Sequence, residues 1–275
     1  MPTLKFPRIA YVAAPLLLAA CAAPAGHPLL LATLYSNTAA EYSATAKGLY
    51  RSAEAQMDIL LGDPVHTAAL EQESPHGRPA VILDVDETVL DNSPFEVRLI
   101  EDHTSYPTGW DEWCNQATAK AVPGALEFTT TAASMGVTVF YVTNRKAHLE
   151  DGTRRNLVAL GFPMGEDIDT LLMRGEREDW TSDKTTRRAH VAKDFRVLML
   201  FGDNMGDFVS LADAKGTPAE RQAAVDEHAE RWGREWVMLP NPMYGYWESA
   251  VLGDATDPTD EEINRLRIQA MDPMR

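Results

Sequence analysis

Three short apolar runs, each four to six residues long, stand out in the central part of the chain. They cover 80–83, 137–142 and 197–201. Continuous apolar runs of this length are typical of parallel strands that are buried on both faces. Helical patterns lie between them near 124–135, 148–160 and 184–194, and weaker strand candidates lie at 170–173 and 235–239. This alternation predicts an α/β fold, a Rossmann-like and mostly parallel sheet flanked by helices.

The segments around these strands follow other patterns. A seven-residue spacing of tyrosines and small apolar residues between Tyr35 and Leu60 predicts a helical N-terminal segment, which Gly62-Asp63-Pro64 would end. Residues 94–122 have no strong periodicity and contain prolines and tryptophans, so we interpret them as an inserted loop or small cap. The tail is acidic, and its last part predicts a helix over 261–271.

The first residues have the composition of a bacterial leader. Lys5 and Arg8 precede an apolar run over 9–20 that is too short to span a bilayer and is typical of a signal peptide. The run ends in Leu18-Ala19-Ala20-Cys21, which resembles the lipobox of bacterial lipoproteins, where the cysteine is lipidated. We therefore expect a signal peptide at 1–21, a linker at 22–30 and a folded domain at 31–275. A lipid anchor at Cys21 would hold that domain in the cell envelope, at the outer membrane facing the periplasm or the surface. The alternative is a secretory signal in which the cysteine is coincidental.

Charge and cysteine content exclude some classes of function. The 275 residues carry a formal net charge of -16, which argues against a nucleic-acid partner, because binding a phosphate backbone requires clustered lysine and arginine. An anionic substrate must therefore be attracted by local positive groups or by a bound cation. Once Cys21 is lipidated, Cys114 is the one remaining cysteine, so the mature chain has no intramolecular disulfide and Cys114 reads as a small buried group.

Each of the three apolar runs ends in a polar cluster. The clusters are Asp84-Val85-Asp86-Glu87-Thr88, Thr143-Asn144-Arg145 and Gly202-Asp203-Asn204-Met205-Gly206-Asp207. The carboxyl ends of parallel strands meet at one edge of a sheet, where open α/β folds bind their ligands. Any one cluster alone reads equally well as a turn or a helix cap. Three of them in this order predict that several carboxylates converge on one site.

Converging carboxylates need a counter-charge. They repel one another and are costly to bury unpaired, and a hard divalent cation such as Mg²⁺, which prefers oxygen ligands, relieves both problems. A carboxylate beside Mg²⁺ can attack a phosphoryl group and form a covalent intermediate. Lys184, between the second and third clusters, is an additional cation at the start of a predicted helix.

These strings resemble one enzyme family. Val81 to Ser93 (VILDVDETVLDNS), Tyr141 to Arg145 (YVTNR), Lys184 and Phe201 to Phe208 (FGDNMGDF) are similar to the haloacid dehalogenase superfamily, and within it to the bacterial class C acid phosphatases, the lipoprotein 5′-nucleotidase group. The resemblance covers most of the chain after the linker. Phe95 is one departure, because the family usually has tyrosine there.

The resemblance implies a role for each catalytic residue. Asp84 would be the nucleophile, and Asp86 would protonate the leaving oxygen and later activate water. Thr143 would bind phosphoryl oxygens, and Lys184 would neutralise the phospho-aspartate, with Lys193 as the alternative lysine. Mg²⁺ would lie on Asp84, the main-chain carbonyl of Asp86 and Asp203, with Asp207 supporting them.

The resemblance also implies where specificity arises. Asn144 would contact substrate, and Trp110 and Tyr244 are candidates to stack on a base or an aromatic leaving group, although plain core packing explains them equally well. The implied activity is Mg²⁺-dependent acid phosphatase hydrolysis of small phosphomonoesters (5′-nucleotides, nicotinamide mononucleotide, aryl phosphates) through an aspartyl-phosphate. A catalytically silent ligand-binding surface lipoprotein and a phosphotransferase are the alternatives, and a homodimer stays open.

Overall fold

The computed structural model describes residues 27–253 and 259–271. The expected signal peptide, the Cys21 lipidation site and most of the expected linker lie outside these residues. Within the described part of the chain, no helix has the length and apolar character needed to cross a bilayer.

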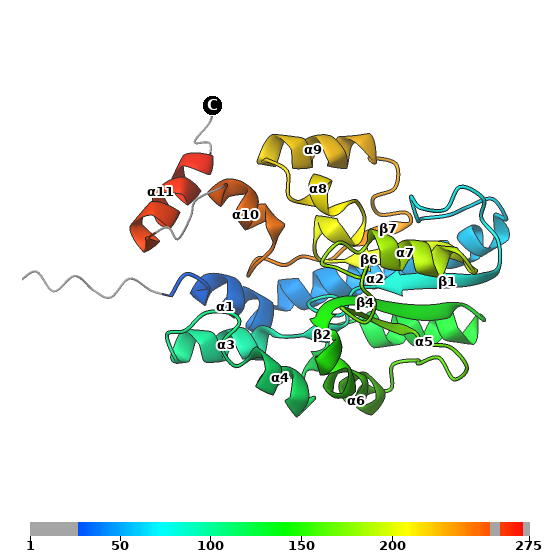
Figure 1. Cartoon of the computed structure of the whole chain (residues 1–275), viewed down its shortest axis with the longest axis horizontal. Coiled ribbons are helices and arrows are strands. Elements are labelled where there is room, and N and C mark those ends of the chain that lie inside the picture. Colours follow the sequence, from blue (N-terminus) through cyan, green and yellow to red (C-terminus); the bar gives the residue numbers. More distant parts are fainter. Residues whose placement is uncertain (1–26, 254–258, 272–275) are drawn as a thin grey trace, which may run out of the picture.

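A five-stranded parallel sheet forms the centre of the fold, in the order β5-β4-β1-β6-β7 (Figure 1). In chain order its strands are β1 (Arg78–Leu83), β4 (Thr138–Lys146), β5 (Leu171–Arg174), β6 (Phe195–Gly202) and β7 (Trp236–Met238). The central strand β1 is buried on both faces: Val81 and Leu83 contribute to one apolar core, and Ala80 and Ile82 to the other. The predicted fold class is confirmed, and so are all five strand positions, because continuous apolar runs have room only in the interior of such a sheet.

Helices cover both faces of this sheet. Side chains of α2 (Ala40–Gly62), α5 (Ala125–Ser134) and α6 (Glu150–Leu160) belong to one core. Those of α7 (Thr185–Ala192) and α8 (Leu211–Ala214) belong to the other. A short 3₁₀ turn, η1 (Ala147–Leu149), precedes α6. The helices predicted near 124–135, 148–160 and 184–194 are therefore present.

The helical N-terminal segment is divided in two. The sequence pattern predicts one helix, but the structure has α1 (Leu30–Thr38) and α2, because Ala39 takes an extended conformation with φ -75° and ψ 128°. Tyr35 and Tyr42 meet edge to face across this bend, with ring centroids 6.3 Å apart. The predicted stripe on α2 is buried, and the helix ends at Gly62 as expected. A seven-residue repeat continues across a single extended residue, so the pattern does not reveal the break.

Residues 94–122, expected to be a loop or small cap, are largely helical. They form α3 (Ser93–Glu101) and α4 (Trp110–Gln116) between the two strands of a small antiparallel sheet, β2 (Leu90–Asp91) and β3 (Lys120–Ala121). Both helices are too short to show a clear period. Phe95 is buried and packs on Trp110 and Trp113 with centroid distances of 5.0 and 6.3 Å, so phenylalanine fills this position without a hydroxyl.

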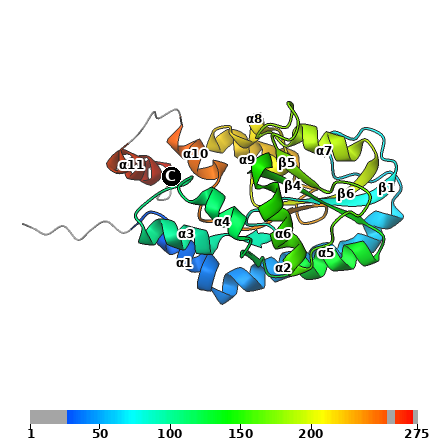
Figure 2. The same ribbon diagram turned by 60° about the horizontal axis from the view of Figure 1, so that its bottom comes forward.

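The last third of the chain adds elements that the sequence pattern does not predict. After β6 come the 3₁₀ turn η2 (Met205–Asp207), α8, α9 (Pro218–Glu227) and α10 (Tyr246–Leu252). None of the residues of α9 is buried, so it has no apolar stripe to reveal it. The tail helix α11 (Asp260–Ala270) matches the predicted one and packs against α10 (Figure 2).

Candidate active site

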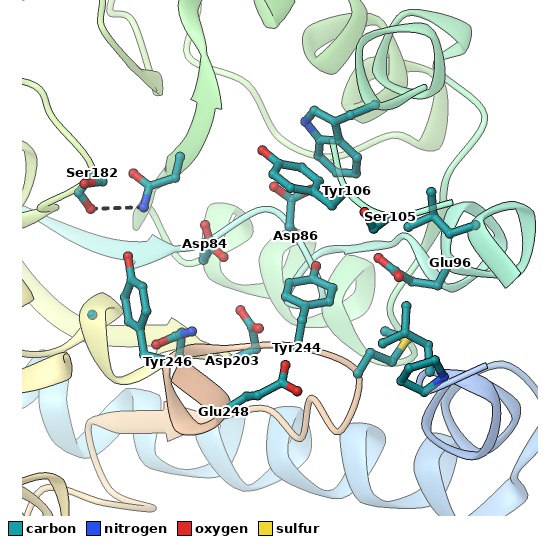
Figure 3. A pocket seen from close by; sticks show the side chains of 18 of the residues that line it. Asp84, Asp86, Glu96, Ser105, Tyr106, Ser182, Asp203, Tyr244, Tyr246 and Glu248 are labelled. Atoms are coloured by element: carbon teal, nitrogen blue, oxygen red, sulfur yellow. Dashed lines mark hydrogen bonds between the residues drawn. The ribbon is translucent and has the colours of Figure 1, made fainter. Parts of the chain in front are cut away.

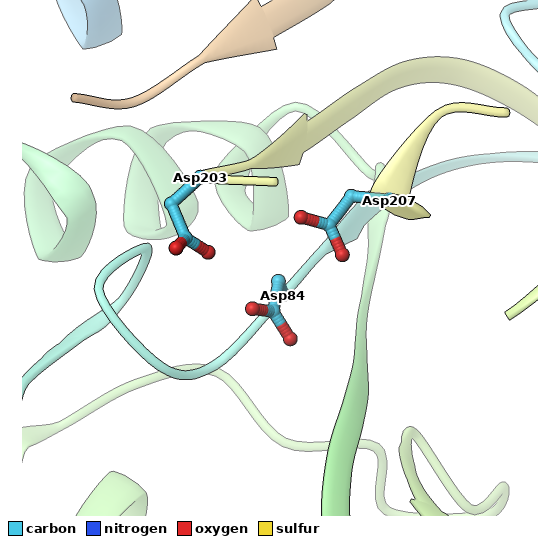
Figure 4. A group of neighbouring side chains, drawn as sticks. All are labelled: Asp84, Asp203 and Asp207. Atoms are coloured by element: carbon cyan, nitrogen blue, oxygen red, sulfur yellow. The ribbon is translucent and has the colours of Figure 1, made fainter. Parts of the chain in front are cut away.

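Three carboxylates meet at the carboxyl edge of the sheet. Asp84 directly follows β1, Asp203 directly follows the neighbouring strand β6, and Asp207 lies in η2 (Figure 4). One oxygen from each of them lies within 4.8 Å of the others. The pairing of β1 with β6 shifts between Ala80 and Val81, but it is regular from there to the strand ends, where Leu83 is the partner of Phe201. The predicted convergence of these three residues is what the structure shows.

Gly202 allows Asp207 to reach this cluster. The Asp207 side chain folds back over the end of β6, where its Oδ2 accepts a hydrogen bond from the Asn204 N–H at 3.0 Å. A Cβ added at Gly202 would overlap the Asp207 carboxylate. The glycine that opens the Gly-Asp-Asn-Met-Gly-Asp string is therefore required by close approach of a side chain.

Lys184 bridges two of the carboxylates. It is the N-cap residue of α7, and its Nζ donates to Asp84 Oδ1 and, at 2.6 Å, to Asp207 Oδ1. Burial alone would lower the pKa of Lys184, but Asp207 and Asp84 raise it, so the ammonium keeps its proton. Lys193, the alternative lysine, is exposed at the opposite end of the same helix.

The cluster has more negative charge than the protein compensates. Burial raises the pKa of Asp84 to about 7 although Lys184 opposes the shift, and burial together with Asp84 and Asp207 raises the pKa of Asp203. Asp203 has a neutral partner, Asn241, whose Nδ2 donates to Oδ2 at 2.8 Å. Three carboxylates against one ammonium leave two negative charges. A cluster of oxygen donors with this surplus fits a hard divalent cation.

Asp86 lies beside the cluster and has its own counter-charge. Its Oδ1 accepts hydrogen bonds from Arg145 Nε at 2.9 Å and from Asn92 Nδ2 at 2.8 Å, and it forms an ion pair with Arg145 Nη2 at 2.8 Å. The Arg145 guanidinium is buried and also donates to Asn92 Oδ1 at 3.2 Å and to Thr153 Oγ1 at 3.1 Å. This network fixes one oxygen of Asp86. The sequence motifs include Arg145 and Asn92, but they indicate no role for either residue; the available signal for Arg145 was a charged residue close to the end of an apolar run.

Thr143 and Asn144 are brought to the same edge but in different ways. The pairing of β4 with β5 is irregular between Thr143 and Lys146. Such an irregularity bends a strand and changes the direction in which its side chains point. Asn144 lines the cavity, and its Nδ2 donates to the Ser182 carbonyl at 3.0 Å (Figure 3). Thr143 is fully buried and does not line the cavity, and its hydroxyl accepts from the Arg145 N–H at 3.0 Å.

Two buried arginines of α7 connect these segments. Arg187 donates to the Thr143 carbonyl and to Asn144 Oδ1, the latter at 2.7 Å. Arg188 pairs with Glu71 at 2.7 Å and donates to the carbonyl oxygens of Gly206, Asp207 and Val209 at 3.2 Å. Helix α7 thus holds the end of β4 and the loop that carries Asp207 in one geometry.

A cavity of about 820 Å³ opens over this edge. Asp84, Asp203 and Lys184 line one part of it, and both predicted aromatic residues, Trp110 and Tyr244, line it too. Figure 3 shows Asp84, Asp203 and Tyr244 around this cavity. Trp110 also takes part in core packing, because its ring packs on Phe95. The Arg145 guanidinium lies over the Trp110 ring, with its Cζ 5.3 Å from the ring centroid. Further lining residues come from α3, the loop before α4, α10 and α11: Glu96, Tyr106, Tyr246, Glu248 and Arg267. Sequence reasoning did not single out these residues, because the helices around them were not predicted or were not placed at the site.

Glu96 is unusual among these residues. Its side chain extends from α3 into the cavity although the residue is only 5% exposed. Burial raises the pKa of Glu96 to about 7, and no other cause contributes.

Comparison with known proteins assigns this arrangement to a family. The profile described as HAD superfamily, subfamily IIIB (Acid phosphatase) matches residues 35–247. The chain belongs to this family. Two structures of the class C acid phosphatase from Bacillus anthracis, one with tungstate bound, superpose with TM-scores of 0.77 and 0.78 at 30% and 31% identity. Each alignment covers 90% of this chain and 98% of the other. The predicted family is confirmed, and these matches support phosphomonoesterase activity.

Plant proteins are similar over a shorter region. Acid phosphatase 1 from Solanum lycopersicum is 31% identical over 178 residues, which cover 61% of this chain and 59% of that protein. The stem 28 kDa glycoprotein from Glycine max is 25% identical over 177 residues, or 62% and 61% of the two chains. The similarity therefore spans about three fifths of these relatives.

Replacing Gly202 by alanine tests the packing of Asp207. We expect Gly202→Ala to lower the free energy of unfolding by about 1–3 kcal/mol, because the added methyl group overlaps a buried carboxylate. Urea denaturation measures the change. Gly48→Ala is the matched control: it lies within α2 with no atom near the added Cβ, so it should leave stability unchanged or slightly raised. Equal effects of the two substitutions would contradict this packing.

The raised pKa of Glu96 predicts a pH-dependent loss of stability. The unfolded chain releases this proton near the ordinary value of 4.5 and the folded chain near 7, so ionisation between these values favours the unfolded state. Glu96→Gln removes the effect and should gain about 1–3 kcal/mol relative to the wild type between about pH 4 and pH 8. Chemical denaturation at both pH values measures it, with exposed Glu101→Gln on the same helix as control. A gain of the same size at both values would refute the shift.

Proposed function

We propose that the protein is a Mg²⁺-dependent acid phosphatase that hydrolyses small phosphomonoesters, including 5′-nucleotides, nicotinamide mononucleotide and aryl phosphates. The observation that carries the proposal is the meeting of Asp84, Asp203 and Asp207 with Lys184 at one end of the cavity. Tungstate in the Bacillus anthracis relative adds support, because it is a tetrahedral oxyanion with the shape of phosphate.

Asp84 is the proposed nucleophile. Its carboxylate attacks phosphorus, the bond to the leaving oxygen breaks, and an aspartyl-phosphate forms. Lys184 contacts Asp84 and Asp207, so it orients the attacking carboxylate and balances negative charge when the phosphoryl group arrives. Burial of both partners strengthens this electrostatic contribution.

Mg²⁺ is the proposed cofactor. Asp84, Asp203 and the main-chain carbonyl of Asp86 would hold it, and Asp207 would support them through its contact with Lys184. When bound, Mg²⁺ would neutralise the surplus charge and polarise the phosphoryl oxygens. Asp203 would contribute an oxygen to the metal. Among the residues that the structure describes, only Asn241 donates a hydrogen bond to the Asp203 carboxylate.

Asp86 is the proposed general acid and base. Arg145 and Asn92 hold its Oδ1, which leaves Oδ2 to give a proton to the leaving oxygen and then take one from the water that attacks the aspartyl-phosphate. Asn144 and Thr143 are the proposed ligands of the phosphoryl oxygens. The buried Thr143 hydroxyl would have to turn toward the cavity for this, whereas Asn144 already lines it. Trp110 and Tyr244 are the proposed stacking partners of the leaving group.

Loss of the nucleophile gives a direct test. With p-nitrophenyl phosphate and Mg²⁺, Asp84→Asn should lower kcat at least about a thousandfold, because an amide cannot form the covalent intermediate. EDTA should abolish activity of the wild type, and added Mg²⁺ should restore it. Asp58→Asn, an exposed substitution on α2, is the control and should keep full activity.

The outcomes separate the alternatives. Full turnover by Asp84→Asn, or by the wild type in EDTA, would contradict the mechanism. Glycerol in the same assay distinguishes hydrolysis from phosphotransfer, because a phosphotransferase would yield a phosphorylated alcohol. Ligand binding without release of phosphate by the wild type would favour the catalytically silent lipoprotein.

We also propose that lipid at Cys21 anchors the protein in the cell envelope. The support is the sequence Leu18-Ala19-Ala20-Cys21 at the end of an apolar run. In a bacterial host, the wild type should sediment with membranes and leave them with detergent, whereas Cys21→Ser should appear in the soluble fraction. Cys114→Ser is the control, since this buried cysteine lies in the core. Membrane retention of Cys21→Ser would refute the anchor.

A further inference from the structure

The carboxylates that line the cavity differ in one respect. Six carboxylates line the cavity, and five of these have a hydrogen-bonded or ion-paired partner. Those five are Asp84 and Asp207 with Lys184, Asp86 with Arg145, Asp203 with Asn241, and Glu248 with Arg267. Among the described residues, none donates a hydrogen bond to the sixth, Glu96, or forms an ion pair with it.

Glu96 is both buried and aimed into the cavity. The residue is 95% buried on α3, and its carboxyl group points toward the cavity centre, on the other side of Asp86 from Asp84 (Figure 3). A buried carboxylate without a partner is costly, and its raised pKa reflects that cost. A group of this kind that lies in a cavity is a candidate for a functional role, such as binding a ligand.

The surroundings of Glu96 favour a cation as that ligand. Tyr106 and Tyr244 line the same part of the cavity, and aromatic faces attract positive charge (Figure 3). His27 and His103 also line it; His27 accepts a hydrogen bond from the Leu29 N–H at 3.3 Å and lies 3.4 Å from the Thr104 carbonyl, and His103 is exposed. Arg267 is already paired with Glu248. The cavity therefore has a phosphate-binding end with Lys184 and an opposite end with an uncompensated carboxyl group.

We propose that Glu96 forms a cation subsite, so that the enzyme prefers phosphomonoesters whose leaving group carries a positively charged nitrogen. This inference rests on the proposed phosphatase function and selects one class among its substrates; nicotinamide mononucleotide belongs to that class, because its pyridinium nitrogen is positively charged. The phosphoryl group binds at Asp84 and Lys184, and the cationic nitrogen lies against Glu96 between Tyr106 and Tyr244. Glu96 takes no part in proton transfer and acts by charge complementarity.

A pair of isosteric substrates tests the inference. Phosphocholine and 3,3-dimethylbutyl phosphate have the same shape, but one carries a quaternary nitrogen where the other carries carbon. The wild type should have a kcat/KM about tenfold higher for phosphocholine, the size expected of a partly desolvated cation contact. A ratio of one or below would overturn the inference without any variant.

Substitutions then assign the preference to Glu96. Glu96→Gln keeps the shape of the side chain and should bring the ratio close to one, whereas Glu96→Asp keeps the charge and should retain part of the preference. Glu101→Gln, exposed on the same helix, controls for loss of one negative charge and should leave the ratio unchanged. An unchanged ratio in Glu96→Gln would refute the role of Glu96.

A parallel assay distinguishes failure of the cation subsite from failure of the proposed phosphatase function. Turnover of p-nitrophenyl phosphate without discrimination between the isosteres would contradict the cation subsite and leave the phosphatase function standing. Absence of turnover of all three esters would contradict both.

Discussion

Compensation of buried negative charge is the constraint on which the site depends. The topology places β1 beside β6, and an aspartate directly follows each strand, so two carboxylates must lie close together. Asp207 adds a third, and Lys184 forms ion pairs with Asp84 and Asp207. Because unpaired charge in the interior costs several kcal/mol, these contacts fix the loops around them as firmly as packing does. The negative charge that remains fits the divalent cation proposed as cofactor.

Helix α7 joins the chemistry to the fold. Lys184, Arg187 and Arg188 are all buried. Lys184 contacts Asp84 and Asp207, Arg187 contacts the end of β4, and Arg188 contacts the backbone around Asp207. A helix packed on one face of the sheet therefore determines the positions of Asp84, the end of β4 and the loop of Asp207 at the same time. Opposite it, α3 and the loop before α4 supply Glu96 and Tyr106, which face the leaving group in the proposed mode of binding.

The sequence predicted the sheet and the acidic cluster, because buried parallel strands have an unmistakable apolar pattern and their carboxyl ends must meet. It did not predict the break at Ala39 or the helix α9, since one extended residue and a helix with no fully buried side chain leave no clear periodic signal. The roles of Arg145 and Glu96 could not be predicted for another reason. Their partners, or lack of partners, depend on tertiary contacts between segments far apart in the chain, such as the 59 residues between Arg145 and Asp86.

Locating the metal tests the central claim most directly. Crystals of the protein grown with Mn²⁺ in place of Mg²⁺ allow the ion to be placed by its anomalous scattering. The account predicts one strong peak at coordination distance from both Asp84 and Asp203. A peak bound elsewhere in the cavity, or no peak at these residues while Mn²⁺ supports turnover, would contradict it.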